Sequence, residues 1–100
     1  MKKSFNERCY AILRKVPRGK ITTYKEIARA LHSKAYRAVG NAMNKNPHAP
    51  KVPCHRVISS DGSIGGFASG TKKKIEMLKG EGVKIVNGKI NLKKFFYKLR

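Results

Sequence analysis

Apolar residues recur at helical spacing in three stretches of the first half of the chain. The first stretch starts at Ser4-Phe5-Asn6-Glu7, which has capping-box spacing, and it predicts a helix from about Ser4 to Lys15. A second capping-box pattern, Thr23-Tyr24-Lys25-Glu26, opens a short predicted helix that ends near Leu31. A tight connection at His32-Ser33 then leads into a third predicted helix, from about Lys34 to Asn44.

The third predicted helix has two distinct faces. Small apolar side chains share the inner face: Ala35, Ala38, Val39, Ala42 and Met43. Arg37, Asn41 and Asn44 share the opposite face. Two short helices joined by a tight turn predict a helix-turn-helix. Gly40 costs the helix about 1 kcal/mol of stability relative to alanine, which is tolerable if a DNA groove must come close to the backbone. An ordinary helical hairpin with a solvated polar face fits the same pattern.

The second half of the chain alternates short apolar runs with turn signals. Val57-Ile58 predicts a short strand, and Thr71 to Lys79 predicts a fourth helix that Gly80 and Gly82 close. Apolar residues alternate around Asn87-Gly88 and predict a β-hairpin, followed by a basic, aromatic tail that we expect to pack on the domain. The predicted fold class is mainly α: a winged-helix-like helix-turn-helix domain with a small C-terminal β-hairpin, in one domain spanning residues 1–100.

Net charge narrows the function classes. The chain has 24 Lys and Arg against 5 Asp and Glu, which gives a formal charge of +19. Such a surplus attracts polyanions and releases their counterions, so we expect DNA binding that weakens steeply with salt. A generic basic surface, as in small ribosomal or nucleoid proteins, is the alternative. No apolar run approaches the roughly 20 residues of a membrane span, and we therefore expect a soluble, intracellular protein with no membrane association.

Cys54 is the candidate nucleophile. His55 and Arg56 follow it directly, and cationic neighbours favour the thiolate, which is the form that attacks carbon. Prolines at positions 47, 50 and 53 predict a stiff loop before it. The alternative is that Cys54 is a small buried apolar residue, as we predict for Cys9 in the first helix. No metal site is expected, because Cys and His residues never fall in paired spacing.

Several motifs of the chain, taken together with their order and spacing, resemble those of a known protein family. Pro53-Cys54-His55-Arg56-Val57, preceded by Arg37 to Met43 and by Asn46-Pro47, resembles the C-terminal domain of O6-alkylguanine-DNA alkyltransferases. The resemblance extends from the first helix through Gly82. It implies a repair protein that flips O6-alkylguanine out of double-stranded DNA and moves the alkyl group irreversibly onto its own cysteine, without a cofactor. It also implies a cytoplasmic, chromosome-associated monomer that lacks the N-terminal α/β domain of many relatives.

The resemblance implies a role for each catalytic residue. Cys54 is the alkyl acceptor, and His55 takes its proton through a water. Glu81, in Gly80-Glu81-Gly82, matches the carboxylate that orients the histidine, which follows the logic of catalytic triads. Asn46 matches the asparagine that braces the active-site loop.

The resemblance also implies substrate and DNA contacts. Tyr24 matches the tyrosine that helps rotate the phosphate and donates toward the base, and Val57 offers backbone contacts to the guanine amine. Arg37 resembles the arginine that fills the gap left by the flipped nucleotide. The pocket is implied to be lined by Phe67, Ala68 and Ser69, and the other DNA contacts of the recognition helix are implied at Tyr36, Ala38, Gly40 and Asn41.

Two features bear on activity. Phe67 stands where a tyrosine is frequent in the family, and Ala68 stands where many relatives carry a serine that donates toward the guanine O6, so the substrate range depends on these positions.

A non-catalytic binder, either alkyltransferase-like or nucleoid, is the alternative function. The cysteine of alkyltransferase-like relatives is commonly replaced by tryptophan, whereas this chain has Cys54 and no tryptophan, which favours the enzyme.

Overall fold

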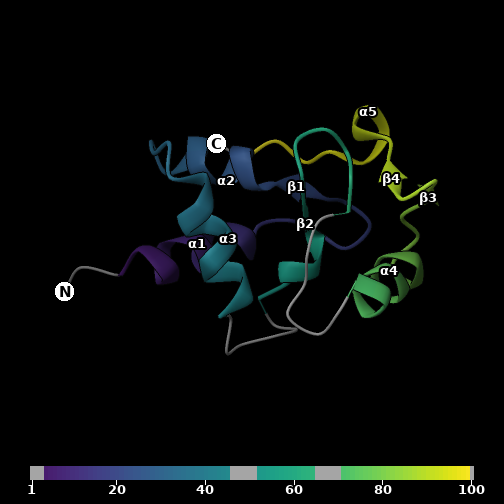
Figure 1. Cartoon of the computed structure of the whole chain (residues 1–100), viewed down its shortest axis with the longest axis horizontal. Coiled ribbons are helices and arrows are strands. Elements are labelled where there is room, and N and C mark those ends of the chain that lie inside the picture. The colour runs from purple at the N-terminus through teal and green to yellow at the C-terminus, as the bar shows by residue number, and fades with distance from the viewer. Residues whose placement is uncertain (1–3, 46–51, 65–70, 100) are drawn as a thin grey trace.

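The helical half of the molecule contains the predicted helix-turn-helix. The structure, a computed structural model, describes residues 4–45, 52–64 and 71–99. Helix α1 (Phe5–Leu13) packs against α2 (Tyr24–Ala30) and α3 (Tyr36–Asn44), and α2 and α3 follow each other around a tight turn (Figure 1). The mainly helical fold class predicted from the sequence is confirmed.

The starts of α1 and α2 show how far the two predicted capping boxes form. Ser4 and Glu7 form the predicted capping box, because the Ser4 hydroxyl accepts from the Glu7 amide at 3.1 Å and the Ser4 amide donates to Glu7 Oε1 at 3.0 Å. The second capping box is only half formed. Thr23 accepts from the Glu26 amide at 3.0 Å, but the Glu26 carboxylate accepts from Arg29 instead of returning to the cap.

Two helix boundaries differ from the prediction. Helix α1 ends at Leu13 rather than Lys15, and α3 starts at Tyr36 rather than Lys34. Ala35 is the N-cap of α3 and has a non-helical ψ of 64°, so the helix does not extend back to Lys34. As a result Ala35 lies before the helix and is exposed, and it does not belong to the inner face.

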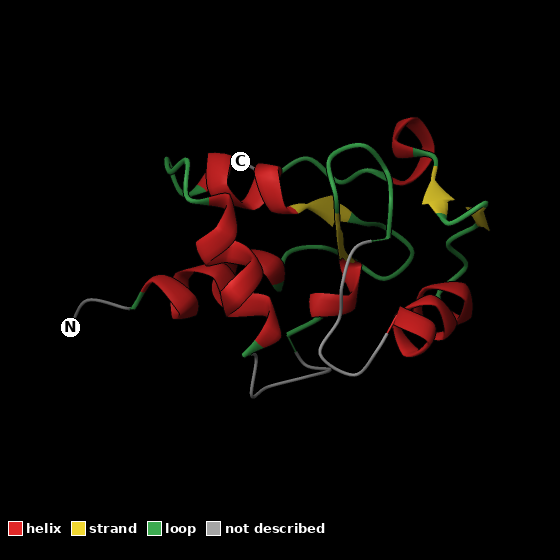
Figure 2. Ribbon diagram, viewed as in Figure 1, coloured by secondary structure: helices red, strands yellow, loops and turns green. Residues whose placement is uncertain are grey.

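The other half of the molecule consists of short elements around a second core (Figure 2). The 3-10 turn η1 (Cys54–Arg56) leads into β2 (Val57–Ile58), and then come α4 (Thr71–Gly80), β3 (Ile85–Val86), β4 (Lys89–Ile90) and α5 (Leu92–Phe95). Strands β3 and β4 pair antiparallel, with Ile85 opposite Ile90. Asn87 and Gly88 between them have φ of 53° and 74°, as a tight two-residue hairpin turn requires. The predicted hairpin is therefore confirmed.

A short parallel sheet joins the two halves. Strand β1 (Thr22–Thr23) pairs with β2, with Thr22 opposite Val57 and Thr23 opposite Ile58. The sequence pattern did not predict this pairing. Because β1 runs directly into α2 and β2 runs directly out of η1, the pairing sets Cys54 close to the start of α2.

The C-terminal tail packs on the domain, as predicted. Leu99 is 2% exposed, and its amide donates to the Glu26 carboxylate. Arg29 donates to the same carboxylate and to the Leu99 carbonyl, so the three residues close the tail over α2. Among the described residues, no helix has the length and apolar character needed to cross a membrane.

Candidate active site

Cys54 is the first residue of η1 and is held from both sides. Its amide donates to the Val52 carbonyl at 2.8 Å, and the Arg56 amide donates to the Pro53 carbonyl at 2.9 Å, which closes the turn. On the other side, Val57 enters the parallel pairing with Thr22. Cys54 is 5% exposed and belongs to the core between the first three helices. The backbone therefore presents this side chain in one fixed position.

A carboxylate meets two basic side chains beside Cys54. Glu81, in the turn after α4, accepts from His55 Nε2 at 2.8 Å through Oε2. Arg56 donates to the same group at both oxygens, from Nε at 2.9 Å and from Nη2 at 2.7 Å. Arg56 also donates from Nη1 to the Val16 carbonyl at 2.8 Å. The structure thus brings Cys54, His55 and Glu81 together, as the resemblance implied, and adds Arg56 as the anchor of the carboxylate.

The electrostatics of this group define the state of the histidine. Burial alone would raise the pKa of Glu81, but the hydrogen bonds from Arg56 and His55 outweigh it and lower that pKa from 4.5 to about 2. Burial lowers the pKa of His55 below 6.5, and the Glu81 contact offsets this only in part. At pH 7 the imidazole is therefore neutral and Glu81 is ionised. Nε2 then carries the proton toward Glu81, which leaves the Nδ1 lone pair to accept a proton.

The other cysteine lies in a different environment. Cys9 is fully buried on the inner face of α1, and burial raises the pKa of its thiol to about 11. A thiol with that pKa stays protonated near neutral pH and is a poor nucleophile. The prediction that Cys9 is a core residue is confirmed.

Tyr24 and Lys74 lie near Cys54 and near each other. Burial, followed by the charge of Cys54, raises the pKa of Tyr24 at the start of α2. Lys74 of α4 is completely buried; its Nζ donates to the Ile64 carbonyl at 2.6 Å and lies 5.8 Å from the centroid of the Tyr24 ring. Burial lowers the pKa of Lys74 from 10.5 to about 8, and the charge of Cys54 opposes that shift.

Lys74 is a residue that the sequence analysis missed. It belongs to a run of three lysines, and Lys72 and Lys73 are exposed. A usable signal was present, because Lys74 lies one turn before Leu78, an apolar residue of this helix that is fully buried. A cation on an apolar stripe is a candidate for a functional role beside a nucleophile.

Comparison with protein families identifies the family of the chain. The DNA-binding domain of 6-O-methylguanine DNA methyltransferases matches residues 4–83. The chain belongs to this family. The match includes every residue of the site described above, from Tyr24 to Glu81.

Curated relatives of this methyltransferase domain are longer than the chain. It is 49% identical over 76 residues to the methylated-DNA–protein-cysteine methyltransferase of Methanosarcina barkeri, covering 75% of this chain and 48% of that one. It is 42% identical over 87 residues to a bifunctional methyltransferase/endonuclease of Picrophilus torridus, covering 86% and 29%. The chain therefore spans about half the length, or less, of these relatives.

Solved structures confirm the fold. S. pombe Atl1, in complex with damaged DNA containing O6-carboxymethylguanine, superposes with a TM-score of 0.86 at 33% identity, covering 98% of this chain and 99% of that one. The O6-methylguanine-DNA methyltransferase of Pyrococcus kodakaraensis has a TM-score of 0.74 at 44% identity, covering 81% and 47%.

The remaining predicted residues of this family member fall into two groups. Tyr36, Arg37 and Asn41 are exposed on α3, Ala38 and Gly40 are half-buried there, and Val57 is buried at the start of β2. Their roles toward DNA and the base stay predictions. Asn46, Phe67, Ala68 and Ser69 lie outside the described residues.

A large cavity lies elsewhere on the molecule. Its volume is about 720 Å³, and it is bounded by α2, the turn before α3, and α5. Neither Cys54 nor His55 lines it. Its position separates it from the group around Glu81.

Proposed function

We propose that this protein removes an alkyl group from O6 of guanine in double-stranded DNA and keeps it on Cys54, once per molecule. The observation that carries the proposal is the arrangement of three side chains: the Cys54 thiol, the neutral imidazole of His55 and the ionised carboxylate of Glu81. Cys54 precedes His55 in one turn, and His55 Nε2 lies 2.8 Å from Glu81 Oε2. This order matches the logic of activated nucleophiles.

The chemistry needs only residues of this chain. The thiol proton moves toward His55 Nδ1, and the thiolate Sγ attacks the alkyl carbon. An S–C bond forms as the bond from carbon to O6 breaks, and the electron pair passes to the guanine. Tyr24 stays protonated near neutral pH because its pKa is raised, so it is suited to donate toward the leaving base. The thioether product has no thiolate leaving group for exchange, and no cofactor is required.

Access to Cys54 requires the base to leave the stack. Cys54 is 5% exposed, and an atom inside a duplex reaches such a site only when its nucleotide is flipped. Extrusion costs a few kcal/mol of stacking and pairing. We propose that Arg37, exposed on α3, fills the gap in the duplex. The partner is therefore double-stranded DNA containing O6-alkylguanine, on the chromosome.

Intact-mass measurement after incubation with O6-methylguanine DNA tests the proposal. We expect the wild type to gain one methyl group per protein and Cys54→Ala to gain none while still binding duplex DNA. Cys9→Ala is the matched control and should react like the wild type. Methyl transfer by Cys54→Ala, or a product ratio well above one, would refute the assignment.

A non-catalytic lesion binder is the second candidate. It is favoured by the comparison with the non-catalytic Atl1, which the chain matches over almost the whole length of both proteins. Cys54 and the absence of tryptophan from the sequence favour the enzyme. Tight binding of O6-methylguanine DNA with no change in protein mass would establish the second candidate instead.

A further inference from the structure

The C-terminal part of the fold carries an unusual set of charges. The family match ends at residue 83, yet β3, β4 and α5 continue the domain beyond it. Residues 71–99 contain nine lysines, no arginine and only two acids, Glu76 and Glu81. Glu81 is already bound by Arg56 and His55. The cations of this region therefore exceed the acids available to neutralise them.

Three of these lysines surround one hollow. A surface depression of about 470 Å³ lies between the hairpin and α5. Its polar lining residues are Lys84, Lys89, Asn91 and Lys94, and its apolar lining residues are Val86, Ile90 and Phe95. All three lysines are exposed. The acid whose charge reaches this group is Asp61, which faces Lys89 and is itself bound by Ser63. We call Lys84, Lys89 and Lys94 the hairpin surface.

We propose that the hairpin surface is a second DNA contact, which binds backbone phosphates of the same duplex that α3 enters. This proposal rests on the proposed function only for its choice of duplex DNA. Lysine is a compact point charge that pairs with phosphate without the fixed planar geometry of arginine. Phosphate contacts position a protein on DNA and carry no sequence information. The hairpin surface therefore adds affinity and leaves lesion selectivity to the site around Cys54.

The shape of the molecule suits two contacts along one duplex. Its principal dimensions are 41 × 25 × 21 Å. Helix α3 lies in one half of the long axis, and β3 and β4 lie at the far end of the other half (Figure 1). At 3.4 Å per base pair, the long axis corresponds to about 12 base pairs. A duplex much shorter than this reaches only one of the two contacts.

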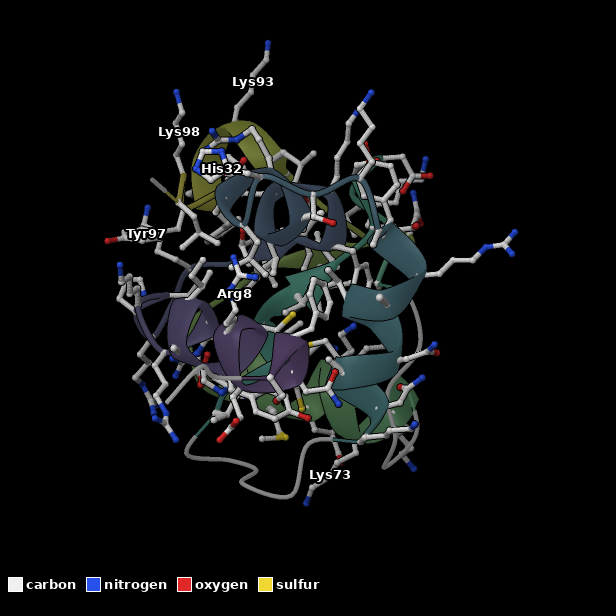
Figure 3. All side chains as sticks on the ribbon, turned by 90° about the vertical axis from the view of Figure 1, so that its left-hand side faces the viewer. Arg8, His32, Lys73, Lys93, Tyr97 and Lys98 are labelled. Carbon is white, nitrogen blue, oxygen red and sulfur yellow. The ribbon has the colours of Figure 1, made fainter. Side chains whose placement is uncertain are left out.

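Exposed basic residues on and after α1 supply a matched control. They are Arg8, Arg14 and Lys15. Viewed from the left-hand side of Figure 1, Arg8 lies near the centre, whereas Lys93 and Lys98 extend at the top and Lys73 at the bottom (Figure 3). Changing Arg8, Arg14 and Lys15 to Gln removes the same charge as changing the hairpin surface.

The experiment compares the salt dependence of binding to an undamaged duplex of about 24 base pairs, twice the length estimated for the long axis. For K84Q/K89Q/K94Q, we expect the slope of log K against log salt to fall by about 2 to 3, because each lost phosphate contact removes about 0.9. The control triple should keep the wild-type slope. Reaction with free O6-benzylguanine should be the same for all three proteins, which shows that the site is intact.

Duplex length provides the second readout. On a duplex of about 8 base pairs centred under α3, shorter than the long axis, the hairpin variant should bind like the wild type. Equal slopes on the long duplex, or an equal fall in the control triple, would overturn the second contact. If the slope of the hairpin variant fell as much on the short duplex as on the long one, the proposed position of the hairpin surface along the DNA would be wrong. Because undamaged DNA is used, these outcomes do not depend on whether Cys54 transfers an alkyl group.

Discussion

Glu81 serves the fold as well as the chemistry proposed for this site. Both of its carboxylate oxygens accept hydrogen bonds from Arg56, and one of them also accepts from His55. Arg56 in turn donates to the Val16 carbonyl, which follows α1. Removing one partner from a buried ion pair is strongly destabilising, because the other charge is left unpaired. The residue that we propose orients His55 therefore also ties the end of α4 to the rest of the protein.

Acid stability should report this role. The pKa of Glu81 is about 2 in the folded protein and 4.5 in a free carboxyl, so its contribution is complete above pH 4.5 and is lost as the pH falls toward 2. We expect the wild type to lose on the order of 2 to 3 kcal/mol more unfolding free energy than Glu81→Gln between pH 5 and pH 2. Urea denaturation at each pH measures this difference.

The control for that experiment lies on α4, the helix that precedes Glu81. Glu76 is exposed on α4, so Glu76→Gln should keep the pH dependence of the wild type. Parallel curves for the wild type and Glu81→Gln would contradict the depressed pKa of Glu81.

At the scale of single elements, Gly40 in α3 has no internal explanation. A Cβ added at Gly40 would meet nothing within 4 Å among the described atoms, and its φ is not in the left-handed region. Glycine inside a helix costs about 1 kcal/mol relative to alanine. A helix that accepts this cost without a packing reason is consistent with the close approach of an external partner.

Gly40→Ala separates folding from binding. We expect this variant to raise the unfolding free energy by up to about 1 kcal/mol and to weaken duplex binding, because the added methyl group lies where the groove would come. Thermal denaturation and DNA titration measure the two effects. Gly80→Ala at the end of α4, where a Cβ also meets nothing within 4 Å, should leave DNA binding unchanged. Equal binding by Gly40→Ala and the wild type would remove the close-approach interpretation.

At the scale of the whole molecule, the proposed alkyl acceptor Cys54 is part of the core. Cys54 packs in the same cluster as Val52, Val57 and Met43, all less than 5% exposed. Two small cores and a parallel sheet of two strands, each two residues long, hold the described part of the molecule together. A group added at Cys54 must therefore be accommodated by the packing of the helical half.

Alkylation should destabilise the protein. Overpacking a core by one methylene typically costs 1 to 3 kcal/mol, and each kcal/mol shifts the Tm of a domain of this size by roughly 4 to 8 °C. We expect methylated protein to melt at least about 4 °C below the unmodified form. Cys54→Ala treated in the same way should show no shift. An unchanged or raised Tm would show that the site has room for the product.

The sequence by itself determined several local elements and the position of the proposed nucleophile in the chain. The Ser4 and Glu7 pair and the Asn87-Gly88 turn act within a few residues, so their helix and hairpin could be predicted from neighbours alone. Cys54 and His55 are adjacent in the chain, and their pairing needed no fold. Glu81, 26 residues after His55, was found only because the motif resembled a family.

Tertiary structure decided the contacts between distant segments. The sequence predicted a strand at Val57-Ile58, but it predicted neither β1 nor the pairing of the two strands. Two residues in β1 are too few to show a period, and the sheet exists because Thr22 and Val57 meet. Lys74 is buried because the Ile64 carbonyl receives its ammonium group, whereas the neighbouring Lys73 remains exposed. Arg56 reaches Glu81 and Val16 only in the folded chain. Burial and pairing depend on which segments meet, and apart from the position of Lys74 one turn before Leu78, no pattern within a few residues indicates them.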